Sequence, residues 1–587
     1  NPFFATKFLK FLHSDGFISF NFTPTTPHYQ GEAKGGWQCD IAKLRALSWT
    51  DDVVEFMAIQ LQKLPVNTQE VLKLASCIGN EFDLATLAIV YEKSQTETAA
   101  DLWKALQEGL VIPITEVYKF FQDSESVAVA KVSELSVTYK FLHDRVQQAA
   151  YFLIPEVQKQ STHLKIGRLL LMNIPETEKE EKIVDLVKQL NIGKELITHQ
   201  TERDKLAKLN LIAGRKAKAS TAYAAAKSYL TVGLELLAVD SWQNNDELTL
   251  ALYELAAQTA YLYGDFEQME KFANIVIQQA ISLLDKVKVY DAKIQASSAQ
   301  GNLKEAMKIG QQVLKQLGVN LPESPSQLES QKGLEETALL CSQQKIEELI
   351  NLSEMTENEP LAALHILSSI AVTAYISAPN LLILVVCKMV NLSLKYGNAI
   401  WSSVGYSAYG LILCGGVQDI EQGYEFGCLA ANLVERFNGE KVKAKVFNIV
   451  GGHIKHWKEH LRETLPILIE GYESGVESGD FEMAGCCAFN ICNLSYFSGQ
   501  ELMALKQKIS TYCKAISYLQ QEVLLKWIAM VLQAILNLLG LTENPIILIG
   551  DVYNEEQELA NAIANNDRNQ LHYLYLNKLI LNYLFGE

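Results

Sequence analysis

A short turn pattern that recurs through the C-terminal two-thirds of the chain limits its fold more than any other feature. The residues Gly-Asp-Phe-Glu stand at 264–267 and again at 479–482, and Gly-Asn-Leu-Lys at 301–304 has the same form. Glycine lets a helix end in a left-handed conformation, Asp or Asn can cap the next helix, and the apolar residue packs between the two. From residue 166 to the end we therefore expect helical hairpins and almost no strand.

Repeated hairpins determine how such a chain can bury its apolar side chains. A second pattern, Gly-Tyr-Glu-x-Gly, occurs at 423–427 and 471–475, and the alanine-rich stretch 217–226 lets helices approach closely. This organisation resembles tetratricopeptide repeats (TPRs), whose period is about 34 residues, although the spacing here is irregular. The resemblance implies stacked hairpins with a continuous core and a concave face that binds peptides or partner domains. We expect a mainly α fold with an irregular TPR-like α-solenoid over 166–587.

Residues 51–165 show a different pattern, in which short helices precede a β-hairpin. Helical periodicity covers 53–64 and ends at Pro65, and Asn67 or Thr68 can cap the helix that follows. The other expected elements are a helix at 84–91 capped by Asp83, a helix that starts at Thr96, and strands at 111–114 and 137–142. Several short helices with a small hairpin are typical of a winged-helix domain. In residues 1–50 we expect a short helix and two strands, at 17–22 and 37–41.

The charge balance argues against a nucleic-acid partner. The chain has 587 residues with 51 Lys and Arg against 68 Asp and Glu, which gives a net charge of −17. A nucleic-acid backbone rewards clustered cations. The expected recognition helix of the winged helix, 96–109, holds Lys104 beside Glu97, Asp101 and Glu108. We therefore expect this domain not to bind DNA.

Cysteine usage and the apolar stretches indicate a cytoplasmic protein without a membrane span. The ten cysteines are scattered and none forms a C-x-x-C pair, so we expect reduced thiols that pack as small apolar groups. No signal peptide is visible. The stretch 360–387 lacks Asp, Glu, Lys and Arg, but Pro379 and Asn380 interrupt it. Two buried helices joined by a turn explain it better than one membrane span.

No catalytic motif is present. A phosphate-binding G-x-x-x-x-G-K-[ST] loop is missing, since the Gly-Lys pair at 193–194 and Gly-Arg-Lys at 214–216 lack both the upstream glycine and the following Ser or Thr. His143-Asp144-Arg145 is not the His-Arg-Asp order of a kinase catalytic loop. We expect this chain itself to be no enzyme and to bind no cofactor alone.

One histidine pattern fits a zinc site. His456, Glu459 and His460 match the H-x-x-E-H arrangement of some zinc peptidases, and His453 would share the stripe if the segment were one helix. The competing interpretation is a charged outer face of a repeat helix, with Trp457 packed as repeat aromatics are. We favour that interpretation and expect no metal.

The segment 141–151 is the most unusual in the chain. Its strand ends at Leu142, and Asp144 can support the start of the next helix beside a packed His143. The functional alternative is an imidazole at a strand–helix junction that meets a phosphate. The residues alone leave both interpretations open.

Several segments, taken together and in order, resemble one protein family. They resemble the middle of very large bacterial signalling proteins that carry a Ser/Thr protein kinase, an AAA-type ATPase of the STAND class (signal-transduction ATPases with numerous domains) and helical repeats, often followed by a GAF sensor and a histidine kinase. The segments that carry the resemblance are 1–4, 62–65, 72–79, 105–110, 141–151 with 154–155, and 163–170.

The resemblance implies that this chain is a piece of a longer protein. The kinase domain and the ATPase core, with ATP or ADP and Mg²⁺, would lie upstream. Residues 1–50 would end the ATPase lid, and 51–165 would form its winged-helix arm. Pro2 is similar in place to the family's adenine-contacting proline. Leu142-His143-Asp144 is similar to the Met-His-Asp motif, whose His contacts the ADP phosphate, with Leu in place of Met.

On these grounds we expect a regulatory or sensory segment of a STAND-type sensor kinase. Its partners would be the upstream ATPase and kinase domains in the same chain and an unknown protein or small-molecule signal on the repeats. The alternatives are a STAND-type transcription regulator with a DNA-binding winged helix, a freestanding repeat scaffold and, more remotely, a zinc peptidase.

Overall fold

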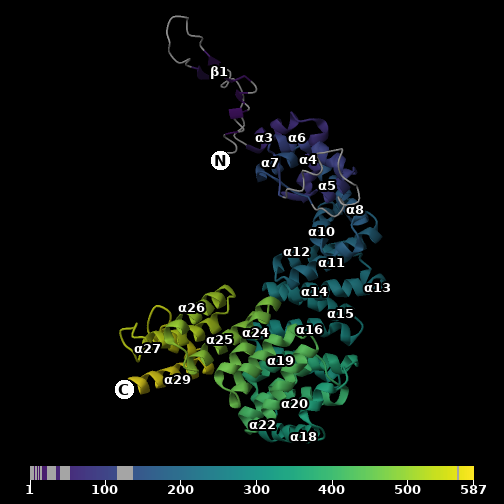
Figure 1. The fold of residues 1–587 in the computed structure, drawn as a ribbon. Coiled ribbons are helices and arrows are strands. Elements are labelled where there is room, and N and C mark those ends of the chain that lie inside the picture. The colour runs from purple at the N-terminus through teal and green to yellow at the C-terminus, as the bar shows by residue number, and fades with distance from the viewer. Residues whose placement is uncertain are drawn as a thin grey trace. The chain divides into compact units, whose positions relative to one another are not determined.

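The computed structural model describes residues 6, 9–10, 12–13, 16–22, 35–39, 53–114, 137–564 and 567–586. The chain divides into two compact units, Asn1–Leu209 and Asn210–Glu587 (Figure 1). The division falls within helix α11 (Gln200–Ala219). The boundary expected at 165/166 lies inside the first unit, within the continuous helix α8 (Glu156–Asn173).

The first unit contains the expected pair of strands near its N-terminal end. β1 (Ile18–Phe22) pairs antiparallel with β2 (Gly35–Cys39), with Phe20 opposite Trp37. The rings of these two residues meet edge to face at 5.3 Å between centroids. The strands predicted at 17–22 and 37–41 are thus confirmed to within two residues at each end.

A helical domain with a three-stranded sheet follows. Strand β5 lies between β3 and β4 and is antiparallel to both, so the predicted hairpin of the fourth and fifth strands is confirmed. The sequence prediction missed β3, because three residues are too few to show alternation. The elements, in order, are α3 (Val53–Gln62), α4 (Val66–Ile78), β3 (Glu81–Asp83), α5 (Leu84–Tyr91), α6 (Gln95–Gln107), β4 (Val111–Pro113), β5 (Thr138–Phe141) and α7 (Asp144–Phe152).

Helix starts in this domain agree with the sequence in one case and differ in another. Asp83 caps α5 as predicted, by accepting a hydrogen bond from the Thr86 backbone N–H at 2.7 Å. The predicted cap of α4 by Asn67 or Thr68 is wrong, because the helix already begins after Pro65 without a side-chain cap. Thr68 is buried instead, and its hydroxyl donates to the carbonyl of Asp101 at 2.9 Å. That bond joins α4 to α6.

The rest of the first unit is helical and is joined to the sheet domain by buried polar contacts. After α8 come α9 (Glu176–Lys179), α10 (Ile183–Ile192), the 3₁₀ turn Lys194–Leu196 and the start of α11. The buried His163 lies between the hydroxyl of Tyr151 at 3.1 Å and Oε1 of Gln189 at 2.6 Å, and Gln189 donates to the carbonyl of Cys77. Burial lowers the pKa of His163.

The second unit consists of stacked helical hairpins, which confirms the expected helical architecture (Figure 1). The first helices of successive hairpins contact one another along one row, which we call the first-helix row. Its members are α14 (Asp246–Tyr263), α16 (Leu283–Ala299), α19 (Asn358–Ser377), α21 (Ser402–Ile412), α23 (Glu440–Ile449), α25 (Phe481–Phe497) and α27 (Glu522–Leu538). The remaining helices are α12 (Tyr223–Leu236), α13 (Ser241–Asn244), α15 (Phe266–Gln279), α17 (Leu303–Gln316), α18 (Gln327–Cys341), α20 (Pro379–Tyr396), α22 (Ile420–Arg436), α24 (Leu465–Ser478), α26 (Leu502–Tyr518), α28 (Glu555–Ala564) and α29 (Arg568–Phe585).

The recurrent turn pattern ends one helix at a left-handed glycine, as predicted, and in two of its three copies an Asp side chain caps the next helix. Gly264 and Gly479 end their helices with φ of +83° and +78°. The carboxylates of Asp265 and Asp480 then accept from the backbone N–H groups three residues on, at 3.2 and 3.3 Å. At the third copy the glycine is left-handed too, but Asn302 makes no side-chain cap.

The apolar stretch 360–387 is two helices, as predicted, with Pro379 as the first residue of the second. By length and composition α19 and α20 are the two described helices that could cross a membrane. Both contribute to the largest apolar core of the second unit, where Leu364, Ile370 and Val385 are fully buried. Core helices of globular proteins pass the same test, so this is weak evidence for a membrane span.

Candidate functional site

The predicted nucleotide contact lies where β5 passes into α7. His143 is the residue before the helix, half-buried, with an extended backbone. Its Nδ1 accepts a hydrogen bond from the Arg145 N–H at 3.2 Å, so the imidazole itself caps α7. Sequence reasoning gave that role to Asp144, which is instead the exposed first residue of the helix. An accepting Nδ1 assigns the ring proton of the neutral imidazole to Nε2.

Charged groups of both signs surround this junction. Lys140 on β5 pairs with Glu81 on β3 at 2.9 Å, and Arg145 donates to the side chain of Gln148 at 2.9 Å. Leu142, which stands where the motif has Met, is 39% exposed. A helix N-terminus with an adjacent guanidinium favours an anion, whereas Asp144 opposes one. Pro2, the predicted adenine contact, lies outside the described residues.

The zinc pattern does not form the geometry that it requires. After α23 the chain makes a π-turn (Val450–Ile454) and then a 3₁₀ turn (Lys455–Trp457), so the histidines do not share one α-helical stripe. Nδ1 of His460 accepts from the Arg462 N–H at 3.2 Å, and Glu459 accepts from the Tyr424 hydroxyl and pairs with Lys455. Across the part of the chain that the structure describes, no group of three or more His, Cys, Asp or Glu residues is placed to hold a metal ion.

The competing interpretation of the same segment is also corrected. Trp457 is not packed in the core, since 45% of it is exposed. The helix changes its winding here because two glycines fit close to other helices. A Cβ on Gly451 would lie 2.7 Å from Leu468, and one on Gly452 would lie 2.5 Å from the Asn490 amide. Burial lowers the pKa of His453 to about 4, so this imidazole is neutral at pH 7.

A partly buried polar network links two helices of the first-helix row, α16 and α19, and touches the residue before α21. Asp291 on α16 accepts hydrogen bonds from the hydroxyl of Ser369 at 2.5 Å and from the amide of Gln295 at 2.9 and 3.0 Å. Nε2 of His365 lies 3.4 Å from its second oxygen, and the imidazole stacks on Trp401 with 4.3 Å between centroids. Burial raises the pKa of Asp291, but His365 and the two donors outweigh it and leave the pKa lowered. No sequence motif marked this network, because its members are far apart along the chain.

A second charged cluster on this row is less well paired. Asp480 caps α25, and the surface residue Glu482 follows in its first turn; partial desolvation, together with repulsion from Asp480, raises the pKa of Glu482. Lys445 on α23 acts against this rise. Burial also raises the pKa of Tyr261, with Glu482 and Asp480 adding to the effect. Lys218 donates to Gln258 at 2.6 Å, and burial lowers its pKa to about 8.

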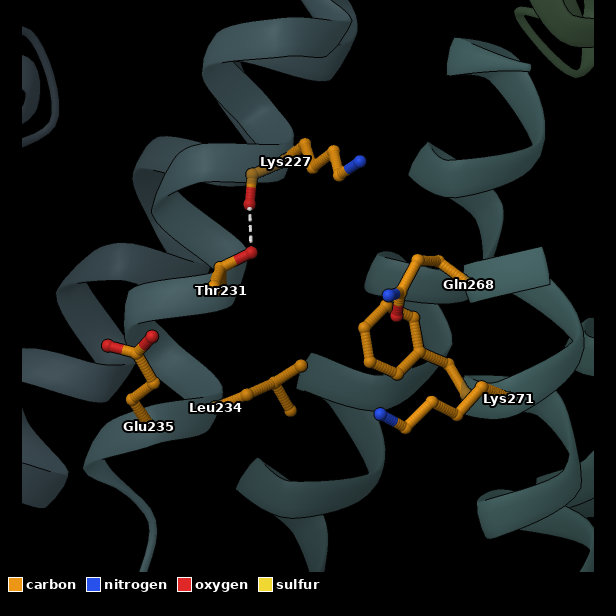
Figure 2. Close-up of a pocket in the computed structure, with 7 residues that line it drawn as sticks. Lys227, Thr231, Leu234, Glu235, Gln268 and Lys271 are labelled. Carbon is orange, nitrogen blue, oxygen red and sulfur yellow. Dashed lines mark hydrogen bonds between the residues drawn. The ribbon is translucent and has the colours of Figure 1, made fainter. Parts of the chain in front are cut away.

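A small cleft of about 500 Å³ lies between α12 and α15. In Figure 2 the side chains of Lys227 and Lys271 extend from facing helices into the space between them. Lys227 already pairs with Asp265 at 2.6 Å. Phe272, Leu234 and other side chains complete the lining. Sequence reasoning did not single out this cleft, since its residues belong to no motif.

The stacked hairpins give the second unit the architecture of helical-repeat proteins, as its turns predicted. No family model matches the chain. It is 26% identical over 554 residues to "Hybrid signal transduction histidine kinase G" of Dictyostelium discoideum. That alignment covers 84% of this chain and 16% of the relative, so the chain spans about a sixth of the relative's length.

One solved structure was also matched. It is a STAND protein (signal transduction ATPase with numerous domains) with a tetratricopeptide repeat sensor from Pyrococcus horikoshii. The match covers 92% of this chain and 67% of that chain at 11% identity, with a TM-score of 0.38. A score this low does not establish a common fold.

Proposed function

We propose that this chain is a regulatory segment of a multidomain signal-transduction kinase, in which helical repeats bind a signal and the first unit relays it to a nucleotide site elsewhere in the protein. The observation that carries the proposal is the alignment with the Dictyostelium histidine kinase over 84% of the chain. The part of this chain outside the alignment is too short to contain the whole first unit, Asn1–Leu209. The relative therefore shares parts of both units and not a repeat array alone.

In this proposal the chemistry belongs to other parts of a cytoplasmic parent protein. A STAND-type ATPase module holds ATP or ADP with Mg²⁺, and a Ser/Thr kinase, a histidine kinase or both transfer phosphate. The absence of a P-loop in the sequence supports a segment that is not itself an enzyme. The partners are then the ATPase and kinase domains in the same chain.

We assign the winged-helix role to residues 51–165. The order of helix, strand, two helices and two strands supports the assignment, as does the placement of β5 between β3 and β4. Within this arm, His143 would report the nucleotide state. The ring proton at Nε2 suits donation to a phosphate oxygen, with Arg145 and the α7 N-terminus as further donors. Pro2 and Asp144 remain candidates by resemblance to the STAND pattern.

The repeats would carry the signal-binding surface. The first-helix row presents both Asp291 with its donors and the less compensated pair Asp480 and Glu482. Partly desolvated charges on a repeat surface are suited to a protein or small-molecule ligand that completes their pairing.

A DNA-binding regulator is the second candidate, and the charges of α6 oppose it. Lys104 pairs with Glu108 at 3.1 Å, and Asp101 pairs with Lys93 at 2.7 Å. A helix whose lysine is neutralised within its own last turn offers little to a phosphate backbone. A freestanding repeat scaffold would bind the same partners but would need no nucleotide-sensing histidine.

The proposal is tested in the full-length parent protein by ADP retention. His143→Ala is expected to speed ADP release by about tenfold, because it removes one hydrogen bond to a charged group. We also expect it to raise basal kinase activity. His460→Ala is the matched control, because His460 also caps a turn through Nδ1 at 3.2 Å but lies in the repeats. Equal ADP release from wild type and His143→Ala would refute the nucleotide role of His143.

A further inference from the structure

Two turns that lie far apart in the sequence touch within the second unit. A Cβ on Gly479, at the end of α24, would lie 2.2 Å from the hydroxyl oxygen of Tyr223 and 3.4 Å from Cγ2 of Thr221. Tyr223 is the first residue of α12, and Thr221 stands in the turn before it. The hairpin of α24 and α25 therefore meets the start of the repeat stack.

The backbone on both sides of this contact adopts a left-handed conformation. Thr221 has φ of +55°, which is a strained position for a β-branched residue. Such strain persists where the surrounding structure holds it, and it concentrates at functional positions. Gly479 has φ of +78°, close to that of Gly264 in the other copy of the turn pattern. Around Gly264, however, no described atom lies within 4 Å of the Cβ position.

The groups behind this contact come from helices that are far apart along the second unit. Tyr261 on α14 interacts electrostatically with Asp480 and Glu482 on α25, and Lys218 on α11 interacts with Lys441 on α23. Along the row, helices α16, α19, α21 and α23 separate α14 from α25. They can interact only if the row curves back on itself, so its charged face lies on the inside of the curve.

We propose that Thr221 and Tyr223 seat against Gly479 as a latch, which closes the curved repeat stack over its charged inner face and opens to admit or release a ligand there. The closure stands on the contact geometry alone. Its use as a signal rests on the proposed function. The test below reads closure without nucleotide or kinase activity, so the two claims can fail separately.

The experiment compares Gly479→Ala with Gly264→Ala in the full chain. Both variants place a Cβ at a left-handed residue before Asp-Phe-Glu, but only the first meets Tyr223. We expect Gly479→Ala to speed amide hydrogen exchange in 218–224 by about tenfold and to raise the radius of gyration. For Gly264→Ala we expect wild-type exchange in that segment.

A double variant tests whether the Tyr223 hydroxyl causes the effect of Gly479→Ala. Adding Tyr223→Phe to Gly479→Ala removes the clashing oxygen and leaves Thr221 Cγ2 at 3.4 Å and Tyr223 Cζ at 3.5 Å, ordinary contact distances. We expect it to restore slow exchange. Equal exchange in Gly479→Ala and Gly264→Ala, or failure of this rescue, would overturn the latch.

Tyr223→Ala covers the case in which Gly479→Ala does not fold. It removes the ring without demanding space at Gly479. We expect faster exchange at 476–482 in this variant. Wild-type exchange at 476–482 would overturn the proposal.

Discussion

Two partly buried carboxylates of the second unit, Asp291 and Asp480, differ in the hydrogen-bond donors around them and in the direction in which their pKa is shifted. Asp291 has two donors and an imidazole around it, and its pKa is lowered in spite of burial. Asp480 has one backbone N–H at 3.3 Å and Lys445 farther away, and burial raises its pKa. The first carboxylate thus contributes to stability, whereas the second is poised to gain from a new partner.

Asp291→Asn is expected to destabilise the second unit by about 2 kcal/mol, because it leaves His365 without a carboxylate and mismatches the Gln295 amide. Urea unfolding measures this loss. Asp285→Asn, on the first turn of the same helix, is the control, and we expect a change below about 0.5 kcal/mol. Equal losses in the two variants would contradict the role given to the network.

The same substitution has a defined pH dependence. Because the folded pKa of Asp291 lies below its ordinary value, its contribution is present above the unfolded pKa of about 3.9 and is lost as pH falls through the folded pKa. The free energies of unfolding of wild type and Asp291→Asn should therefore differ most above pH 5. The difference should shrink in acid. A gap that stays constant down to pH 3 would contradict this account.

At the scale of single elements, two helices start with the same device in different units. Ser94 before α6 and Ser326 before α18 each form a capping box, with the serine oxygen 3.2 Å from the backbone N–H of the glutamate three residues on. Each box satisfies helix-end donors that would otherwise lack partners.

Ser94→Ala and Ser326→Ala should each cost about 1 kcal/mol, but in different units. Because the two units are separately compact, calorimetry should show that Ser94→Ala lowers the melting temperature of the first unit alone. Ser326→Ala should lower the melting temperature of the second unit alone. If either variant lowered both transitions equally, the units would not unfold independently.

Local chemistry in the sequence was enough to predict the elements that depend on it. The left-handed Gly264 and Gly479, the Asp83 cap and the hairpin of β4 and β5 were all predicted from neighbouring residues. Features that depend on distant packing were not. The cap by His143 replaced the expected Asp144, and the π-turn at Val450–Ile454 follows from glycines pressed against other helices.

The candidate sites divide in the same way. The position of His143 at a strand–helix junction could be predicted, because the strand and helix are continuous in sequence. The Asp291 network, the cleft beside Lys271 and the contact at Gly479 join segments that are far apart, and only the fold brings them together. The false zinc pattern shows the converse, since a correct spacing fails when the helix it assumes is not formed.

On the scale of the whole molecule, the central claim is that the repeats and the first unit form one relay. The chain corresponds to about a sixth of its Dictyostelium relative, and the proposed function assigns the activity that receives the relay to other parts of the parent protein. A relay requires that a change confined to the repeats alters binding at the nucleotide site by a measurable coupling free energy. The latch at Gly479 offers a change of this kind with a matched control.

The most direct measurement is therefore the rate of ADP release from the full-length protein carrying Gly479→Ala or Gly264→Ala, with hydrogen exchange on the same samples to show whether the latch is open. The account predicts that Gly479→Ala changes the ADP release rate by about fivefold or more, and that Gly264→Ala leaves it as in wild type. An open latch in Gly479→Ala with an unchanged ADP release rate would contradict the relay.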